Sequence, residues 1–250
     1  MLTVKGLTVK YDASDAVCAL ESVDFSVESG EKIALIGANG AGKSTLLSAA
    51  VGILPPHSGQ IVFDGVAVGK ETLRDLRLKV GMVFQNPDDQ LFMPTVYEDI
   101  AFGPRNLGLA EEEIETRMEG ILARLGASYL KERMTHKLSG GEKRLAALAG
   151  VLIMEPSVLL MDEPSSFLDP RARRRLMEIL ATLPQAMLIA THDLDLALDL
   201  CQRAVLLKEG RIEADAPVEE VLSDASLLER CGLELPLSAK PPRARTISVK

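Results

Sequence analysis

The chain has 250 residues, 47% of them hydrophobic and 26% charged, which is typical of one large globular domain or a domain with a subdomain. Its formal net charge of −8 argues against general binding to nucleic acid or anionic lipid, since both reward a basic surface. The N-terminus lacks a secretory pattern and no apolar run approaches the ~20 residues that span a bilayer, so we expect a cytoplasmic protein that contacts membranes through a protein partner.

The first third of the chain predicts mainly strands, because short apolar segments rich in β-branched residues alternate there with Gly, Pro and Ser turns. From about residue 95 to residue 154 the pattern becomes helical, with apolar residues recurring on one face. We therefore expect a helical subdomain inserted at about residues 88–155. The expected strands are residues 7–9, 23–27, 33–36, 61–63 and 80–83, and the apolar helical face is Ile114, Met118, Ile121, Leu122 and Leu125.

Strands return after this insertion. The segments "VLLMD" and "AMLIAT" indicate buried parallel strands, with helices beginning near Pro170 and Asp193. The sequence thus predicts one α/β domain over residues 1–235 that the helical insertion interrupts. Residues 236–250 are basic and proline-bearing, which predicts a solvated tail.

The segment "KIALIGANGAGKSTLL" places a buried strand before, and a helix after, a glycine-rich loop that matches G-x-x-x-x-G-K-[ST]. Glycines let backbone N–H groups surround phosphates, while Lys43 reaches the β- and γ-phosphates and Ser44 can ligate Mg²⁺. The alternative is a glycine turn with an unrelated lysine, and the motif alone does not separate a kinase, a GTPase and a transport ATPase. The residues expected to bind nucleotide are Gly37, Asn39, Gly40, Ala41, Gly42, Lys43, Ser44 and Thr45.

Two acids end the strand "VLLMD" at the carboxyl edge of the predicted sheet, where α/β proteins bind ligands. Asp162 suits the Mg²⁺ side of such a site, and Glu163 can polarise the water that attacks the γ-phosphate. His192 ends the next strand, at the same edge, and its position favours contact with the γ-phosphate. The alternatives are an acidic turn that closes a strand and a structural histidine.

A second anion-binding pattern lies in "LSGGEKRLAALAG", where Ser139, Gly140 and Gly141 precede a helix with an apolar face. The simplest interpretation is a serine N-cap with a flexible turn. Consecutive glycines at a helix N-terminus also expose amides to an anion, yet the chain already has one phosphate loop. The two patterns are reconciled if two chains face each other and each gives its helix N-terminus to the nucleotide held by the other.

With these motifs, residues 1 to about 235 resemble the ATP-binding cassette (ABC) family, in which "LSGGE" corresponds to the signature that completes an ATP site across a dimer. The resemblance implies a P-loop NTPase core with a RecA-like parallel sheet, an N-terminal antiparallel β region and an inserted α-helical subdomain. It also implies an ATPase that uses ATP and Mg²⁺, in which ATP binding closes the dimer, and Glu163 and His192 promote hydrolysis.

Further residues match the family motifs one by one. Tyr11 resembles the aromatic that stacks on adenine, although an edge-strand tyrosine is an alternative, and Gln85 resembles the glutamine that senses Mg²⁺ and the attacking water. The segment "SSFLD" resembles the loop that touches the opposite subunit, with Asp169 as its clearest match and Phe167 bulkier than the usual glycine or alanine. Lys143 replaces a glutamine that is common there, and the sequence indicates no obvious chemical consequence of this change.

The segment "VFQNPDDQLF" and the following "TVYEDIAFGPRNLGL" resemble the ATP-binding subunits of energy-coupling-factor importers, above all those for cobalt and nickel. This implies a peripheral protein at the cytoplasmic face of the cell membrane, with a membrane coupling protein docking near Gln85, Asp88 and Asp89. These two acids and Glu98 would face incoming arginines. The alternatives are a solvated acidic turn here, a vitamin importer, and an ABC ATPase unconnected with transport.

The resemblance also implies a substrate-binding membrane subunit, whose substrate this chain does not contact. The second cassette is either another copy of this chain or a similar chain. Two copies of this chain alone could build both composite sites, because the glycine loop, signature, Glu163 and His192 are all present here.

Overall fold

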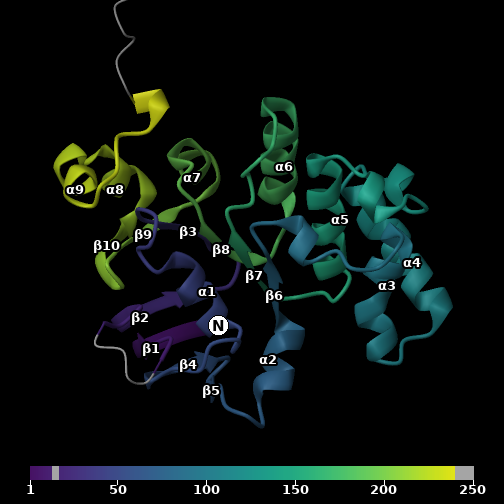
Figure 1. Ribbon diagram of the computed structural model, residues 1–250, viewed down its shortest axis with the longest axis horizontal. Coiled ribbons are helices and arrows are strands. Elements are labelled where there is room, and N and C mark those ends of the chain that lie inside the picture. The colour runs from purple at the N-terminus through teal and green to yellow at the C-terminus, as the bar shows by residue number, and fades with distance from the viewer. Residues whose placement is uncertain (13–16, 240–250) are drawn as a thin grey trace, which may run out of the picture.

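The computed structural model describes residues 1–12 and 17–239, and contains two β-sheets with helices packed around them (Figure 1). From residue 240 onward the basic tail expected at residues 236–250 lies outside the described residues. At the described start of this tail, the backbone N–H groups of Leu237 and Ser238 donate hydrogen bonds to the Asp195 carboxylate. Across the described residues, no helix is both long enough and apolar enough to cross a membrane.

The first sheet is antiparallel and has the strand order β2-β1-β4-β5. Its inward residues, such as Leu2, Val4 and Leu7, are fully buried and pack with apolar residues of β3 and α1. Alternation of buried and exposed positions is typical of an antiparallel sheet with one covered face. The elements are β1 (Leu2–Val9), β2 (Leu20–Val27), β4 (Ser58–Phe63) and β5 (Val66–Ala67).

The second sheet has the order β10-β9-β3-β8-β7-β6, in which all neighbouring strands are parallel except the pair β9 and β10. Every residue of β3, β7 and β8 is buried, as expected for strands covered on both faces. The predicted α/β fold is confirmed, whereas the edge hairpin of β9 and β10 was not predicted. The strands are β3 (Lys32–Ile36), β6 (Val80–Val83), β7 (Val158–Asp162), β8 (Ala186–Ala190), β9 (Arg203–Lys208) and β10 (Arg211–Pro217).

Helices α3, α4 and α5 gather on the side of the second sheet away from β10, at the right of Figure 1. Thr95 and Ser139 start α3 and α5 with reciprocal capping boxes to Glu98 and Glu142, which satisfy N–H groups that each helix start leaves unpaired. On the predicted face of α4, Ile114, Met118, Leu122 and Leu125 are buried and Ile121 is partly buried.

The helices of the described residues pack around the two sheets. They are α1 (Lys43–Ala50), α2 (Leu73–Lys79), α3 (Val96–Asn106), α4 (Glu111–Arg124), α5 (Gly140–Leu152), α6 (Pro170–Thr182), α7 (Leu194–Leu200), α8 (Val218–Ser223) and α9 (Ala225–Arg230), with short 3₁₀ turns at Pro87–Asp89, Ser128–Leu130, Thr135–Lys137 and Leu237–Ala239. The helices predicted to begin near Pro170 and Asp193 are α6 and α7.

The parallel strands bring the sequence motifs to one edge of the second sheet. The glycine loop follows β3, Gln85 lies just beyond β6, Asp162 ends β7, and His192 lies just beyond β8. Because parallel strands have their carboxyl ends at the same edge, segments more than a hundred residues apart in the sequence meet there.

Candidate functional site

The glycine loop, the segment after β6, the end of β7 and the β9–β10 turn line a cleft of about 1430 Å³ at this edge. It unites most of the residues that the sequence analysis expected to bind nucleotide and metal. The predicted residues that line it are Tyr11, Asn39, Gly40, Ala41, Gly42, Lys43, Ser44, Thr45, Gln85, Asp162 and Glu163.

The glycine loop is shaped by close backbone approaches. A Cβ on Gly37 would lie 2.3 Å from the carbonyl oxygen of Leu207, and one on Gly42, at φ +107°, would lie 2.8 Å from that of Ala19. Both distances are too short for any side chain, so only glycine lets the loop turn here. At the mouth of the cleft, the exposed Tyr11 ring directs its hydroxyl to Thr45 Oγ1, at 2.7 Å.

Lys43 lies at the start of α1, with its Nζ 2.7 Å from the carbonyl oxygen of Gly37. Burial lowers the pKa of this ammonium, an effect that the nearby carboxylates of Glu163 and Asp162 oppose. A cation thus lies beside two acids in a site largely shielded from water, where charges interact more strongly than at the surface.

Asp162 has the features of a cation ligand. It is 7% exposed, and its Oδ1 is buried without a hydrogen-bond partner among the described residues. Burial raises the pKa of this carboxyl, against the hydrogen bond from Ser44 that lowers it. The unpaired Asp162 oxygen, the Ser44 hydroxyl that bonds this carboxyl, and the Gln85 side chain in the same cleft together form a donor set that fits Mg²⁺.

Replacing Asp162 with asparagine is expected to stabilise the nucleotide-free protein. The pKa of the Asp162 carboxyl is higher in the folded than in the unfolded state. Ionised Asp162 therefore destabilises the folded protein at any pH above the unfolded pKa, and this cost disappears only in acid below it. Asp162→Asn removes the charge and should raise Tm by about 2 °C or more at neutral pH. Calorimetry without nucleotide measures this shift, and a lower Tm would contradict the assigned burial cost.

Glu163 and His192 are in direct contact. The Nδ1 atom of His192 lies 2.8 Å from Oε2 of Glu163, which also accepts from the Thr191 hydroxyl at 3.3 Å. Glu163 is 6% exposed, whereas the His192 side chain is 63% exposed and lies outside the described set of residues that line the cleft. The backbone of Glu163 has φ +45°, a strained conformation that functional sites often retain.

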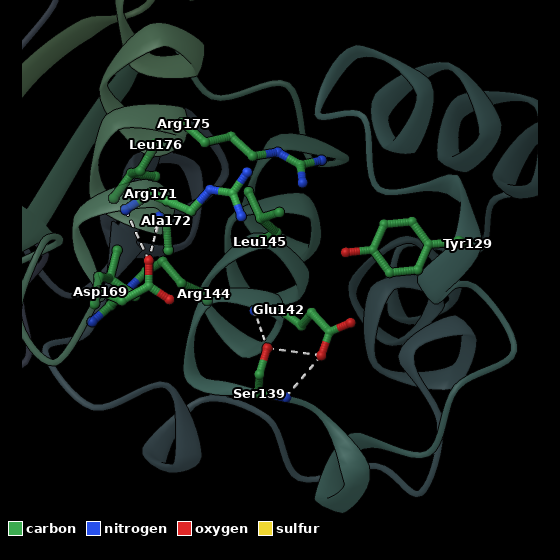
Figure 2. A pocket seen from close by; sticks show the side chains of 12 residues that line it. Tyr129, Ser139, Glu142, Arg144, Leu145, Asp169, Arg171, Ala172, Arg175 and Leu176 are labelled. Carbon is green, nitrogen blue, oxygen red and sulfur yellow. Dashed lines mark hydrogen bonds between the residues drawn. The ribbon is translucent and has the colours of Figure 1, made fainter.

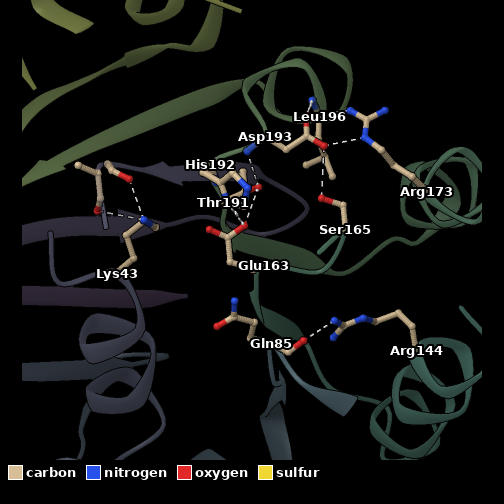
Figure 3. Close-up of polar contacts among 12 residues, drawn as sticks. Lys43, Gln85, Arg144, Glu163, Ser165, Arg173, Thr191, His192, Asp193 and Leu196 are labelled. Carbon is tan, nitrogen blue, oxygen red and sulfur yellow. Dashed lines mark hydrogen bonds and ion pairs between the residues drawn. The ribbon is translucent and has the colours of Figure 1, made fainter. Parts of the chain in front are cut away.

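An ion pair supports the segment that carries His192 (Figure 3). Arg173 donates to both carboxylate oxygens of Asp193, at 2.6 and 2.9 Å, and Asp193 also caps α7 through the N–H of Leu196. The Ser165 hydroxyl lies 3.3 Å from the same carboxylate. The loop after Glu163 and the loop around His192 are therefore held to one another.

The signature residues are not among the described residues that line this cleft. Ser139 and Gly141 line a separate cavity of about 510 Å³ with Asp169 (Figure 2), and Gly140 lines another of about 570 Å³ that also includes Gln85. Ser139 Oγ and backbone N–H both lie 2.8 Å from Glu142 Oε2. One chain therefore holds the phosphate loop and the signature in different places.

The acidic segment after Gln85 is partly engaged within the chain. Lys143 forms an ion pair with Asp88 at 2.5 Å, a contact that the sequence analysis did not predict. Glu98 is used in the capping box of α3, while Asp89 is exposed and no ion pair within the described residues involves it. Phe167 is 86% exposed at φ +64°, a left-handed backbone that is unfavourable for a bulky residue.

Sequence reasoning missed several residues at the site. Part of the cleft lining comes from the turn between β9 and β10 and from the segment before β2, including Cys18, Ala19, Lys208 and Arg211. The buried Arg144, two residues beyond the signature glutamate, donates to the carbonyl oxygens of Phe84 and Gln85. The only sequence signal for this contact was the presence of a charged residue, Arg144, on the apolar side of a predicted helix.

Comparisons with known proteins agree with these features. Residues 20–166 match the family described as ABC transporter. The chain is 43% identical over 244 residues to the energy-coupling factor transporter ATP-binding protein EcfA of Methanothermobacter thermautotrophicus, over 96% of this chain and 78% of that protein. CbiO1 of Clostridium perfringens, part of the ABC transporter complex CbiONQ, has a TM-score of 0.81 and 40% identity, covering 92% of this chain and 93% of its own.

A third relative, the ATP-binding cassette MJ0796, was solved as a dimer in a post-hydrolysis state bound to ADP and Pi. Its TM-score is 0.77 with 25% identity, and the match covers 87% of this chain and 99% of MJ0796. The chain therefore belongs to the ABC transporter family, as an ATP-binding cassette that hydrolyses ATP.

Proposed function

We propose that this ATPase powers an energy-coupling-factor importer for cobalt or nickel, as a peripheral subunit at the cytoplasmic face of the cell membrane. The observation that carries the proposal is the likeness to EcfA and CbiO1, which extends over nine-tenths or more of the chain. The cobalt or nickel part rests on CbiO1 and on the resemblance in "VFQNPDDQLF".

The proposed working unit contains two cassettes. In one chain the phosphate loop and Ser139 line different cavities, so a second chain, identical or similar, would complete each ATP site with its own signature. Residues 1–235 would act as one ATP-binding domain with its helical subdomain at about 88–155. ATP binding would close the pair and phosphate release would reopen it, which is the mechanical output.

The cleft residues have separable roles in this proposal. The glycine loop and Lys43 hold the phosphates, Tyr11 contacts adenine, and Glu163 polarises the attacking water while His192 contacts the γ-phosphate. Mg²⁺, held by Ser44, Gln85 and Asp162, would neutralise charge on the phosphates.

The proposed docking surface for a membrane coupling protein lies around the segment after Gln85. Phe92 and Phe102 form an edge-to-face pair there, with ring centroids 4.9 Å apart, and both are exposed. Since Asp88 is paired with Lys143, the exposed Asp89 is the acid that we assign to an incoming arginine. An apolar platform beside an available carboxylate fits a short helix that carries a guanidinium.

Reversing Asp89 tests the function and its partner together. Asp89→Lys should lower recovery of the membrane subunits with this chain about tenfold or more, because a like charge then faces the arginine. ATP binding should be unchanged, since Asp89 lies outside the described residues that line the cleft. The measurements are copurification with the coexpressed membrane subunits and ATP-dependent uptake of radioactive cobalt into vesicles.

Glu229→Lys, an equal charge reversal on the exposed side of α9, is the matched control and should assemble normally. Unchanged recovery of the Asp89→Lys complex would refute the docking site. Vesicles that accumulate a vitamin instead of cobalt or nickel would refute the substrate while leaving the importer role in place.

A further inference from the structure

We infer that Arg144 is a positioning residue for Gln85, which it ties to the signature helix so that the two move together. The inference rests on the proposed role of Gln85 in binding Mg²⁺ and orienting water. It concerns a contact between α5 and the segment after β6, on the far side of the Gln85 backbone from the cleft.

The contact is a forked hydrogen bond to two consecutive carbonyl groups. Arg144 Nη1 donates to the carbonyl oxygen of Phe84 and Nη2 to that of Gln85, both at 2.5 Å. In Figure 3 the Gln85 side chain points away from Arg144, toward Lys43 and Glu163. The guanidinium thus fixes the backbone of Gln85 and leaves its amide directed into the cleft, which Gln85 lines.

The burial of Arg144 argues against a merely structural role. The residue is 2% exposed, and its Nε has no hydrogen-bond partner among the described residues. Burial lowers the pKa of its guanidinium to about 10, which leaves it charged at neutral pH. An apolar side chain would fill the buried position of Arg144 at least as well. The buried guanidinium is therefore better explained by the position in which it holds the Phe84 and Gln85 carbonyl groups.

Two further contacts join the same segment to α5. Gln90 accepts from the Phe84 N–H and donates to the carbonyl oxygen of Ala147, each at 3.2 Å, so Phe84 is held at both its N–H and its carbonyl. Lys143 adds its ion pair with Asp88. Any displacement of α5, which begins at the signature, therefore displaces Gln85, and arrival of the signature at a nucleotide is linked to the position of Gln85.

The test is a double-mutant cycle on ATP hydrolysis by the full chain. Arg144→Met should lower kcat about tenfold or more, since small misplacements of a catalytic group cost up to 10²-fold. The Kd for ATP should change much less than kcat, because Arg144 is not among the described residues that line the cleft. Arg144→Lys keeps the positive charge that acts on the Asp162 carboxylate and so separates that effect from positioning. In a Gln85→Ala background the same substitution should change kcat less than about twofold, since coupled residues are non-additive.

Arg144→Lys keeps the charge and can reach one carbonyl, so it should recover part of kcat. If Arg144→Met does not fold, Arg144→Lys replaces it in the double-mutant cycle. The matched control is Arg77→Met, because Arg77 also bonds two consecutive carbonyls, those of Val51 and Gly52, away from Gln85. It should leave kcat unchanged.

An equal loss of kcat in the wild-type and Gln85→Ala backgrounds would overturn the inference and assign Arg144 a structural role. Unchanged kcat in Arg144→Met would overturn it as well. Full activity of Gln85→Ala alone would reject the proposed role of Gln85 itself, and that outcome is distinguishable because it requires no change at Arg144.

Discussion

Glu163→Gln is expected to lower the rate of ATP hydrolysis by ~10²-fold or more while ATP binding is retained. The amide keeps the size of the carboxylate and can still contact His192, but it cannot accept a proton from water. Affinity should be equal or higher, because a negative charge is removed from the buried site that holds Lys43 and Asp162. Phosphate release gives the rate, and titration with a fluorescent ATP analogue gives the affinity.

Glu178→Gln, on the exposed face of α6, is the control for loss of a carboxylate and should hydrolyse ATP normally. Turnover that survives in Glu163→Gln would show that another group activates the water. Loss of both ATP binding and ATP hydrolysis would instead indicate that Glu163 maintains the structure of the cleft.

The sequence could predict those parts of the fold whose signals are local. The strand, glycine loop and helix around Lys43 follow each other within nineteen residues, and the start of α5 after Ser139 is encoded by a capping pattern of four residues. The meeting of Lys43, Gln85 and Asp162 was also predictable, because each follows or ends a parallel strand and such ends share one edge.

Contacts between distant segments could not be predicted in this way. Arg144 meets Phe84 and Gln85 across about sixty residues, and no periodicity specifies which backbone carbonyls a buried guanidinium will reach. The Lys143–Asp88 pair depends equally on how α5 packs against the turn after β6. The positive φ of Phe167 could not be predicted either, because bulky residues rarely adopt a left-handed backbone conformation.

Mixing two inactive variants is expected to restore ATP hydrolysis if two copies of this chain share their sites. Lys43→Ala removes the proposed phosphate ligand, and Gly140→Asp places a carboxylate at the signature, where it would repel the phosphate that we propose binds there. The aspartate should not disturb its own chain, since the nearest atom to a Cβ at Gly140 is the carbonyl oxygen of Phe167, 3.9 Å away. Acids are also favoured at a helix N-terminus.

In a mixed pair, the Gly140→Asp chain supplies an intact phosphate loop and the Lys43→Ala chain an intact signature, so one of the two sites is whole. Equal mixing should therefore restore about a quarter of wild-type activity, since half of the pairs are mixed. A chain with both substitutions, mixed with Lys43→Ala, provides no whole site and is the control. Full activity of Gly140→Asp alone would show that the signature does not serve a nucleotide. If both variants are inactive alone and in the mixture, two copies of this chain do not complete each other's sites. The second cassette is then a different chain.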